Sequence, residues 1–253
     1  MKQALLLAFL LLITACNSGK KSSVEKKHPA NQVQLADNKD ANWADSVIAY
    51  RQQARQGDGD AYLKLARCYH DGRGVERDYL TMLAMVANAA HYLSFPMEEF
   101  INSLPRHSEY RLLYEGMEAA EQEDDEAIYV RIVELETMES KEAELLRMIR
   151  AGFGYSPDSL AWLLYKNVKE ESSVFAQSLA SVGAMNAGDY QHAVKTLQRI
   201  VPRSPAVWLS LASLYASDTS VHNDSLANLC YAKADEYALL TLPQQKRLKS
   251  TKE

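Results

Sequence analysis

The chain has 253 residues, of which 47% are hydrophobic and 24% are charged, and its formal net charge is −5. This composition is close to the average for a globular protein. The length is sufficient for one sizeable core or a short repeat array. No basic stripe that could neutralise phosphates is present, so nucleic acid is excluded as an expected partner.

The first sixteen residues resemble the signal of a bacterial lipoprotein. Lys2 supplies a positive charge, and residues 4–13 form an apolar segment that is typical of a cleaved signal peptide and too short to span a bilayer as a helix. Residues 12–16, Leu-Ile-Thr-Ala-Cys, are similar to a lipobox, which predicts removal of residues 1–15 and acylation of Cys16. Loss of Lys2 would change the formal charge from −5 to −6. The alternatives are ordinary cleavage with a bystander cysteine and an uncleaved anchor.

Residues 16–40 are predicted to be a flexible tether. The segment is rich in Ser, Lys, Asn and Gln, and its scattered apolar residues cannot bury enough surface to fold. Outer-membrane lipoproteins lack an aspartate directly after the lipidated cysteine, and Asn17 is similar to that pattern. The residues that follow include several lysines rather than an acidic run. We therefore expect a lipid-anchored protein of the bacterial cell envelope, at the outer membrane and facing the periplasm.

A repeat within residues 41–253 predicts the fold. A shift of 146 residues aligns eight identical residues without a gap, from Leu63 with Leu209 to Leu83 with Leu229. Each copy is expected to be a helix, a turn and a second helix, because its apolar residues recur at helical spacing. Asp78 and Asp224 are expected to cap the second helix of each copy.

The first copy is similar to the Sel-one-like repeat, a relative of the tetratricopeptide repeat. The residues that carry this resemblance are Gly57, Ala61, Leu65, Tyr69, Gly72, Gly74, Val75, Asp78, Ala89 and Ala90. Glycines in the turn at residues 71–75 permit a positive φ at a tight interhelical bend, whereas a phosphate-binding loop would follow a strand. Met82 and Met85 depart from the family, where Ala and an aromatic residue are usual.

The middle of the chain shows helical periodicity without a clear repeat signature. Its apolar sets are Tyr110, Leu113, Tyr114, Met117 and Ile128, Ile132, Leu135. The acidic run at residues 121–126 lacks the ligand spacing and central glycine of a calcium loop, so a solvated interhelical turn is expected.

The C-terminal part is also similar to a tetratricopeptide array. Residues 187–190, Ala-Gly-Asp-Tyr, precede Ala193 and Leu197 in a pattern like the family's Gly-x-Tyr-x-x-Ala signature. Ser204 with Pro205, and Ser156 with Pro157, are signals for helix starts. No β pattern interrupts these helices, so the prediction is an all-α, right-handed superhelix of four to six hairpins at roughly 34 to 40 residues each.

Candidate chemistry is sparse. The six histidines form no close pair with zinc-ligand spacing, and neither a metal nor a cofactor is expected. Cys68 and Cys230 could pair in an oxidising compartment, but both lie among helical core residues, and two buried thiols are the preferred interpretation.

The expected function is a non-catalytic, protein-binding scaffold for envelope proteins. Its binding residues are predicted on the first helix of each hairpin, at Tyr62, Lys64, Arg67, Trp208 and Ser210. Tyr62 and Trp208 are equivalent under the 146-residue shift, and both could instead fill the core between repeats. The alternatives are an assembly lipoprotein that acts as a spacer and an enzyme acting on cell-wall polymer, which a deep polar pocket with perturbed titratable groups would indicate.

Overall fold

The computed structural model describes residues 42–93, 97–151 and 157–250, and every regular element within these ranges is a helix. This confirms the predicted all-α class. The predicted signal peptide (1–15), the tether (16–40), Cys16 and Ser156 lie outside the described residues. The helices are α2 (Trp43–Arg55), α3 (Gly59–Asp71), α4 (Tyr79–Leu93), α5 (Met97–Asn102), α6 (Glu109–Glu121), α7 (Asp125–Thr137), α8 (Glu142–Ala151), α9 (Pro157–Asn167), α10 (Val174–Asn186), α11 (Tyr190–Ile200), the 3₁₀ helix η1 (Val201–Arg203), α12 (Val207–Ala216), α13 (Asp224–Glu236) and α14 (Leu242–Ser250).

One turn geometry recurs along the chain at the ends of six helices. In each, a residue adopts a left-handed backbone conformation, and the next N–H donates to the carbonyl five positions earlier at 2.9 to 3.2 Å. The left-handed residues are Gly57, Gly72, Glu123, Glu139, Gly188 and Ala238. This Schellman geometry satisfies carbonyls at a helix end that would otherwise lack partners. Only half of these turns carry the glycine that makes them visible in the sequence.

In four of these turns the next residue caps the following helix. Asp58 Oδ1 accepts from the Asp60 N–H at 2.9 Å, and Asp124 Oδ1 accepts from the Ala127 N–H at 2.9 Å. Asp189 and Ser140 cap α11 and α8 in the same way. The acidic run at residues 121–126 is therefore an interhelical turn, as predicted.

The turn between α3 and α4 needs its glycines. Gly72 and Gly74 have φ values of +74° and +70°, which confirms the expected positive φ. A Cβ on Gly74 would lie 2.4 Å from the carbonyl oxygen of Trp43, at the start of α2. Gly74 thus permits both the backbone conformation and the close approach of α2.

The 146-residue equivalence holds for the first helix of each copy and is wrong for the second. Leu65, Ala66 and Tyr69 match buried residues of α12. The N–H that bonds to the carbonyl of the shared tyrosine belongs to Asp78 in the first copy and to Asn223, one position earlier in the alignment, in the last. Asn223, rather than Asp224, accordingly caps α13 by accepting from the Leu226 N–H.

This one-residue offset exposes two leucines that the alignment placed in a core. Leu226 and Leu229 are 38% and 53% exposed, whereas Leu80 and Leu83 are each 5% exposed. With an offset of 145 residues the buried faces agree, and the matched pairs are Met82 with Ala227, Met85 with Cys230, and Ala89 with Ala234.

The predicted start at Ser204 is also displaced. Helix α12 begins at Val207, after a turn in which the Val207, Trp208 and Leu209 N–H groups donate to carbonyls three residues earlier. The start predicted at Pro157 for α9 is confirmed.

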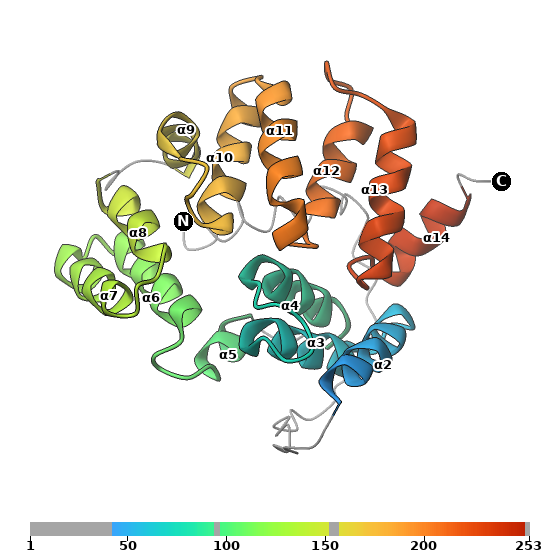
Figure 1. Ribbon diagram of the computed structural model, residues 1–253, viewed down its shortest axis with the longest axis horizontal. Coiled ribbons are helices and arrows are strands. Elements are labelled where there is room, and N and C mark those ends of the chain that lie inside the picture. Colours follow the sequence, from blue (N-terminus) through green and yellow to red (C-terminus); the bar gives the residue numbers. More distant parts are fainter. Residues whose placement is uncertain (1–41, 94–96, 152–156, 251–253) are drawn as a thin grey trace.

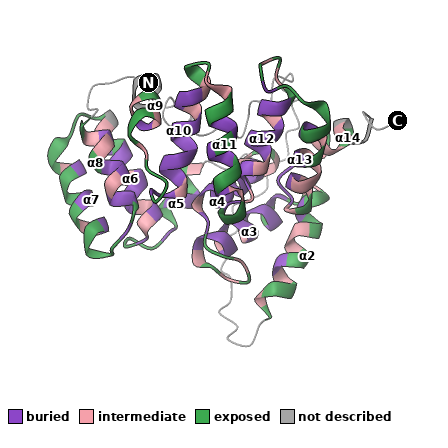
Figure 2. Cartoon of the chain, turned by 45° about the horizontal axis from the view of Figure 1, so that its top comes forward, coloured by how far each residue is buried: buried purple, intermediate pink, exposed green. Residues whose placement is uncertain are grey.

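The buried sides of the helices form one core (Figure 2). The apolar sets predicted for the middle of the chain are all buried there, including Leu113, Ile128 and Leu135 at 0% exposure. Cys68 and Cys230 are buried free thiols, which confirms the preferred interpretation, and burial raises the pKa of each to about 11.

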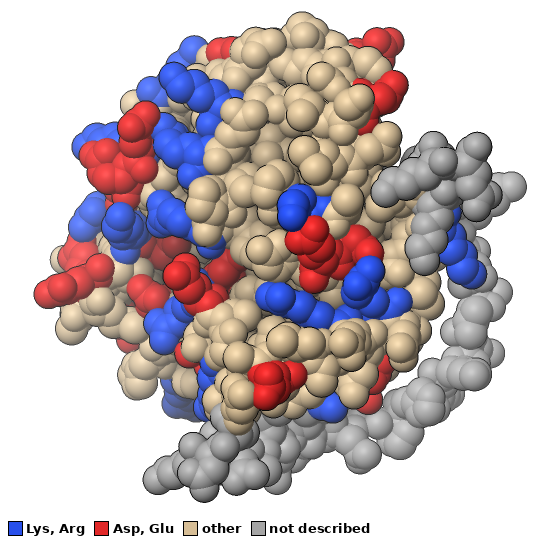
Figure 3. Space-filling model, turned by 45° about the vertical axis from the view of Figure 1, so that its right-hand side comes forward, with Lys and Arg blue, Asp and Glu red and all other residues tan. Residues whose placement is uncertain are grey.

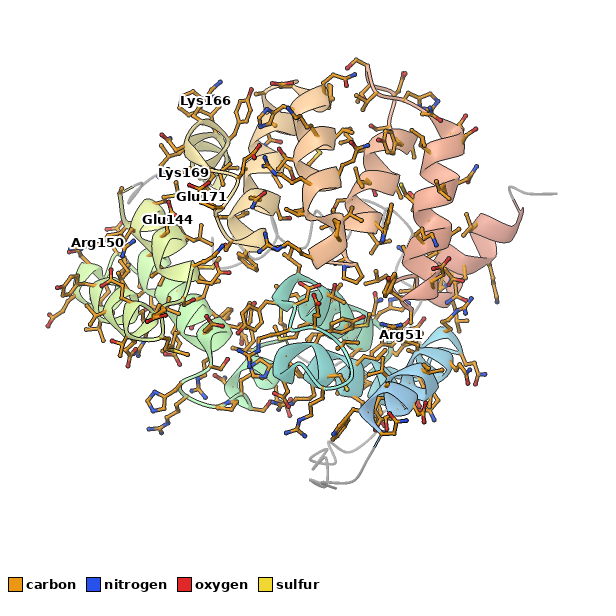
Figure 4. All side chains as sticks on the ribbon, viewed as in Figure 1. Arg51, Glu144, Arg150, Lys166, Lys169 and Glu171 are labelled. Carbon is orange, nitrogen blue, oxygen red and sulfur yellow. The ribbon has the colours of Figure 1, made fainter. Side chains whose placement is uncertain are left out.

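The first and last hairpins meet, so the succession of helices closes on itself (Figure 1). The Tyr62 hydroxyl donates to the Leu240 carbonyl at 3.2 Å, and Asn88 Nδ2 donates to the Leu239 carbonyl at 3.0 Å. The Leu242 N–H donates to the Tyr92 hydroxyl at 2.9 Å. Arg51 lies beside the same junction, with its guanidinium carbon 4.8 Å from the centre of the Tyr237 ring (Figure 4). Residues 237–242 therefore fill the space beside α3 and α4.

Candidate functional site

The residues predicted to contact a partner do not form one surface. Tyr62 is 0% exposed and stacks on Tyr92, with ring centroids 5.7 Å apart and planes 8° from parallel. Ser210 is 8% exposed. The prediction that these two residues face a ligand is wrong, because the C-terminal segment covers Tyr62 and the core encloses Ser210. For Tyr62, the alternative of a core residue is correct.

The other three predicted residues make contacts within the chain. Lys64 Nζ lies 5.4 Å from the centre of the Tyr50 ring, and the Arg67 guanidinium carbon lies 4.8 Å from that of Phe100. Arg67 also donates to the Ser103 carbonyl at 3.2 Å. Trp208 is half-buried against the core, and among the described residues no hydrogen bond or ring contact joins it to the α3 residues.

A different site is present where several helices begin. A hollow of about 330 Å³ is lined by the residues before α4 and its first turn, Glu109 at the start of α6, the α7–α8 turn, the start of α10, and Arg203 of η1. Because most of these segments are helix N-termini, their backbone dipoles place partial positive charge near the hollow. We call this space the N-terminal hollow, after the helix N-termini that surround it.

The N-terminal hollow has a buried floor and an exposed rim. The floor includes Asp78, Ser140, Glu142, Ser173 and Phe175, all at most 9% exposed. The exposed lining residues are Glu76, Arg77, Glu139, Lys141 and Arg203. Solvent therefore reaches the rim, while the polar groups of the floor are largely removed from water.

Glu142 is the central titratable group of the floor. It is 8% exposed, and its Oε2 accepts from the Ser173 hydroxyl at 2.9 Å. Burial raises the pKa of Glu142 to about 7, with a further contribution from the Glu109 carboxylate, while the Ser173 hydrogen bond and the Arg203 charge oppose the shift. The carboxyl group can therefore gain or lose a proton near neutral pH.

The local helix chemistry holds both partners of that hydrogen bond in place. Ser173 caps α10 by accepting from the Ala176 N–H at 3.1 Å, so its hydroxyl hydrogen is free to point at Glu142. Ser140 Oγ accepts from the Glu142 N–H at 3.2 Å at the start of α8. Two helix caps thus position one buried carboxyl group.

A second carboxylate lies on the same hollow. The Tyr79 hydroxyl donates to Glu109 Oε2 at 2.7 Å, and Arg77 Nη1 is 3.7 Å from the same oxygen. Asp78, beside them, accepts from the Leu80 N–H, as predicted for a cap. Burial raises the pKa of Asp78, and the hydroxyls of Thr81 and Ser204 oppose that shift.

No local sequence pattern predicts the N-terminal hollow. Ser173 before an apolar run is a recognisable helix cap, but its second role depends on α8 lying beside α10. Glu142 resembles any acidic residue in a first helical turn. Its burial follows from packing between segments about thirty residues apart, which no local pattern reports.

Within the described ranges, no group of three or more His, Cys, Asp or Glu side chains is placed to hold a metal ion. The same ranges contain no helix with the length and apolar character needed to cross a membrane. The sequence matches no protein-family model, and the chain matches no curated protein and no solved structure.

Proposed function

We propose that this protein is a membrane-tethered, non-catalytic scaffold that binds other proteins of the bacterial cell envelope. The observation that carries the proposal is the recurrence of one helix–turn–helix geometry along the described chain. At each of six turns, one residue has a left-handed backbone conformation and the next N–H makes the same type of hydrogen bond. Arrays of such hairpins present extended surfaces assembled from many short segments, which suits protein recognition. In this proposal the hairpins form a right-handed superhelix of the tetratricopeptide or Sel-like kind, whose first and last members touch.

The tether belongs to the same proposal. An acylated Cys16 and residues 16–40 would hold the helical domain at the periplasmic face of the outer membrane, within reach of envelope proteins. Figure 3 shows acidic and basic side chains intermixed on one face of the domain rather than a basic patch, which fits protein partners better than nucleic acid.

The N-terminal hollow is the surface that we assign to partner binding. Segments from five parts of the chain meet there, and its exposed rim carries charges of both signs above a buried floor. Tyr62, the α3 aromatic residue predicted from the sequence to contact a partner, is already covered by residues 237–242, so it cannot serve this purpose in the closed array.

A hydrolase acting on cell-wall polymer is the second candidate. The observation that favours it is Glu142, a buried carboxyl group with a pKa of about 7, beside the second carboxylate of Glu109. Glycoside hydrolysis uses such a pair, in which one carboxyl group stays protonated near neutral pH.

Photocrosslinking from the rim separates the two candidates. A photoreactive amino acid at Glu76, on the rim, should capture a discrete envelope protein in living cells, whereas the same group at Asp218, an exposed residue of the α12–α13 loop that does not line the hollow, should not. The scaffold proposal is contradicted if neither site gives an adduct and the purified protein cleaves cell-wall polymer in a reaction that Glu142→Gln abolishes.

A further inference from the structure

We propose that Asp71, His70 and Ser108 form a catalytic triad in which Ser108 is a nucleophile toward small carboxylic esters. His70 and Asp71 are the last two residues of α3, and Ser108 directly precedes α6. The inference goes beyond the proposed binding role, because a reactive serine gives the protein an activity of its own.

Two hydrogen bonds in series join the three side chains. His70 Nδ1 lies 2.6 Å from Asp71 Oδ1, and His70 Nε2 lies 2.8 Å from Ser108 Oγ. A nucleophile in contact with a base, with the base oriented by a third group, is the arrangement that serine hydrolases share on unrelated folds. Because such triads differ in chain order, contact geometry rather than sequence position identifies this one.

The charge of Asp71 sets the tautomer of His70. The hydrogen bond from His70 lowers the pKa of Asp71, and Arg73 and Arg67 add to that shift while burial opposes it. An ionised carboxylate can only accept hydrogen bonds, so the single proton of the neutral imidazole lies on Nδ1. Nε2 then presents a lone pair to the Ser108 hydroxyl, as a general base requires.

The start of α6 fixes the orientation of the serine. Ser108 Oγ accepts from the Arg111 N–H at 3.3 Å, so the hydroxyl proton is free to point at His70. His70 and Ser108 are 7% and 8% exposed. Their burial keeps most solvent away from the pair and strengthens its electrostatic interactions.

Two backbone groups beside Ser108 can stabilise an oxyanion. The N–H groups of Glu109 and Tyr110 open α6, and neither donates to an acceptor among the described residues. The first N–H groups of a helix lack partners within the helix, and the helix dipole adds partial positive charge there. The N–H of the residue after the nucleophile stabilises the tetrahedral intermediate in other serine hydrolases that carry the serine at the start of a helix.

A substrate can approach from the N-terminal hollow. Glu109, which follows Ser108, lines this space, and so does Tyr79, whose ring centroid is 6.1 Å from that of His70. The volume of the hollow, about 330 Å³, is at the lower end of the range for small-molecule sites. We therefore expect a small ester rather than a polymer to be the substrate.

The reaction is an acyl transfer in two steps. Ser108 Oγ bonds to the acyl carbon while its proton passes to His70 Nε2, and the ester C–O bond then breaks as His70 gives that proton to the departing alcohol. Water next attacks the acyl-serine and gives a proton to His70. His70 returns this proton to Ser108 Oγ as the carboxylic acid leaves, which restores the triad.

The test is covalent labelling of the full-length lipidated protein in detergent micelles. The probe is an alkyl fluorophosphonate that carries biotin, from which a serine nucleophile displaces fluoride. We expect the folded protein to be labelled, the heat-denatured protein to remain unlabelled, and peptide mass spectrometry to place the adduct on Ser108. Absence of labelling, or an adduct on another serine, overturns the inference.

Two variants separate catalysis from a structural role for these hydrogen bonds. Ser108→Asn retains a capping acceptor for α6 and removes the nucleophile, so labelling should be lost. Asp71→Asn cannot hold His70 in the required tautomer, so the labelling rate should fall by a factor of roughly 100 or more. Labelling of Asp71→Asn at the parent rate overturns the inference, even if both variants are less stable than the parent.

Asp224→Asn is the matched control. Asp224 Oδ2 lies 3.6 Å from His222 Nε2, but His222 Nδ1 faces the Ser217 carbonyl at 3.1 Å rather than a hydroxyl. The control should therefore be labelled like the parent, and so should its hydrolysis of 4-nitrophenyl acetate match. Labelling of Ser108 together with capture of a partner from the rim would keep the binding role and withdraw only its non-catalytic character.

Discussion

The first hairpin, α3–α4, and the last, α12–α13, share eight identical residues under the 146-residue shift but occupy different surroundings. Tyr62 of α3 is covered by residues 237–242, and α4 is buried on nearly every side. Helix α13 buries only Ala227, Cys230 and Ala234 within its length and leaves two leucines in solvent. The comparison shows that identical residues at aligned positions predict a shared helix but not a shared environment, because burial is set by the neighbours of each hairpin.

The largest expected difference concerns Tyr62 and Trp208, the aligned aromatic residues of the two copies. Tyr62→Ala should lower the free energy of unfolding by about 3–5 kcal/mol, since a fully buried ring and its hydrogen bond to Leu240 are lost. Trp208→Ala, which removes a half-buried ring, should cost about 1–2 kcal/mol. Urea denaturation measures both values, and equal losses would contradict the different environments of the two rings.

Leu83 and Leu229 sharpen the same comparison. Leu83→Ala leaves a cavity in the core and should cost about 3 kcal/mol. Leu229→Ala should change stability by less than about 0.5 kcal/mol, because that side chain is 53% exposed. If thermal denaturation shows the same loss of stability for both variants, the 146-residue alignment would be correct for the second helix as well.

The turns of the two copies should respond differently to a β-branched residue. Gly74→Val places a β-branched residue at a positive φ and brings its Cβ against the Trp43 carbonyl. The free energy of unfolding should fall by about 2 kcal/mol or more. Ser220→Val, at the aligned exposed position, should be nearly neutral. Differential scanning calorimetry of the two variants is sufficient, and a neutral Gly74 variant would mean that α2 does not approach this turn.

These pairs also show how far the sequence could predict the fold. The helical class, the buried faces of α3, α6 and α7, and the positive φ of Gly72 and Gly74 followed from periodicity and residue type. The one-residue offset in α13 could not be predicted. Three identities after the loop, at Asp224, Leu226 and Leu229, favoured the ungapped alignment, although these residues are not structurally equivalent to their partners in the first copy. The burial of Glu142 was equally hidden, since it depends on α8, α10 and η1 meeting.

The smallest expected effect distinguishes the two candidate caps of α13. Asn223→Ala removes the acceptor for the Leu226 N–H and should cost about 1 kcal/mol. Asp224→Ala, at the first helical position, removes an exposed favourable charge and its 3.6 Å contact with His222 Nε2, and should cost a few tenths of a kcal/mol. The chemical denaturation midpoint should be lower for Asn223→Ala than for Asp224→Ala, and the opposite order would show that Asp224 is the cap.

The burial of Glu142 is tested by the pH dependence of stability for the parent and for Glu142→Gln. We propose that the N-terminal hollow, rather than the Tyr62 side of α3, is the functional surface, and burial of Glu142 on its floor opposes ionisation of that carboxyl group. With a folded pKa of about 7, raised from 4.5, the folded state binds more protons than the unfolded state between these pH values. This group's contribution to stability must therefore fall as pH rises from 5 to 8.

We expect the two proteins to have similar stability at pH 5, and the glutamine variant to be more stable at pH 8 by at most roughly 3 kcal/mol. Denaturation curves that stay parallel from pH 5 to pH 8, with no gain for Glu142→Gln at the higher pH, would contradict this expectation, because Glu142 would then ionise as an ordinary exposed residue does.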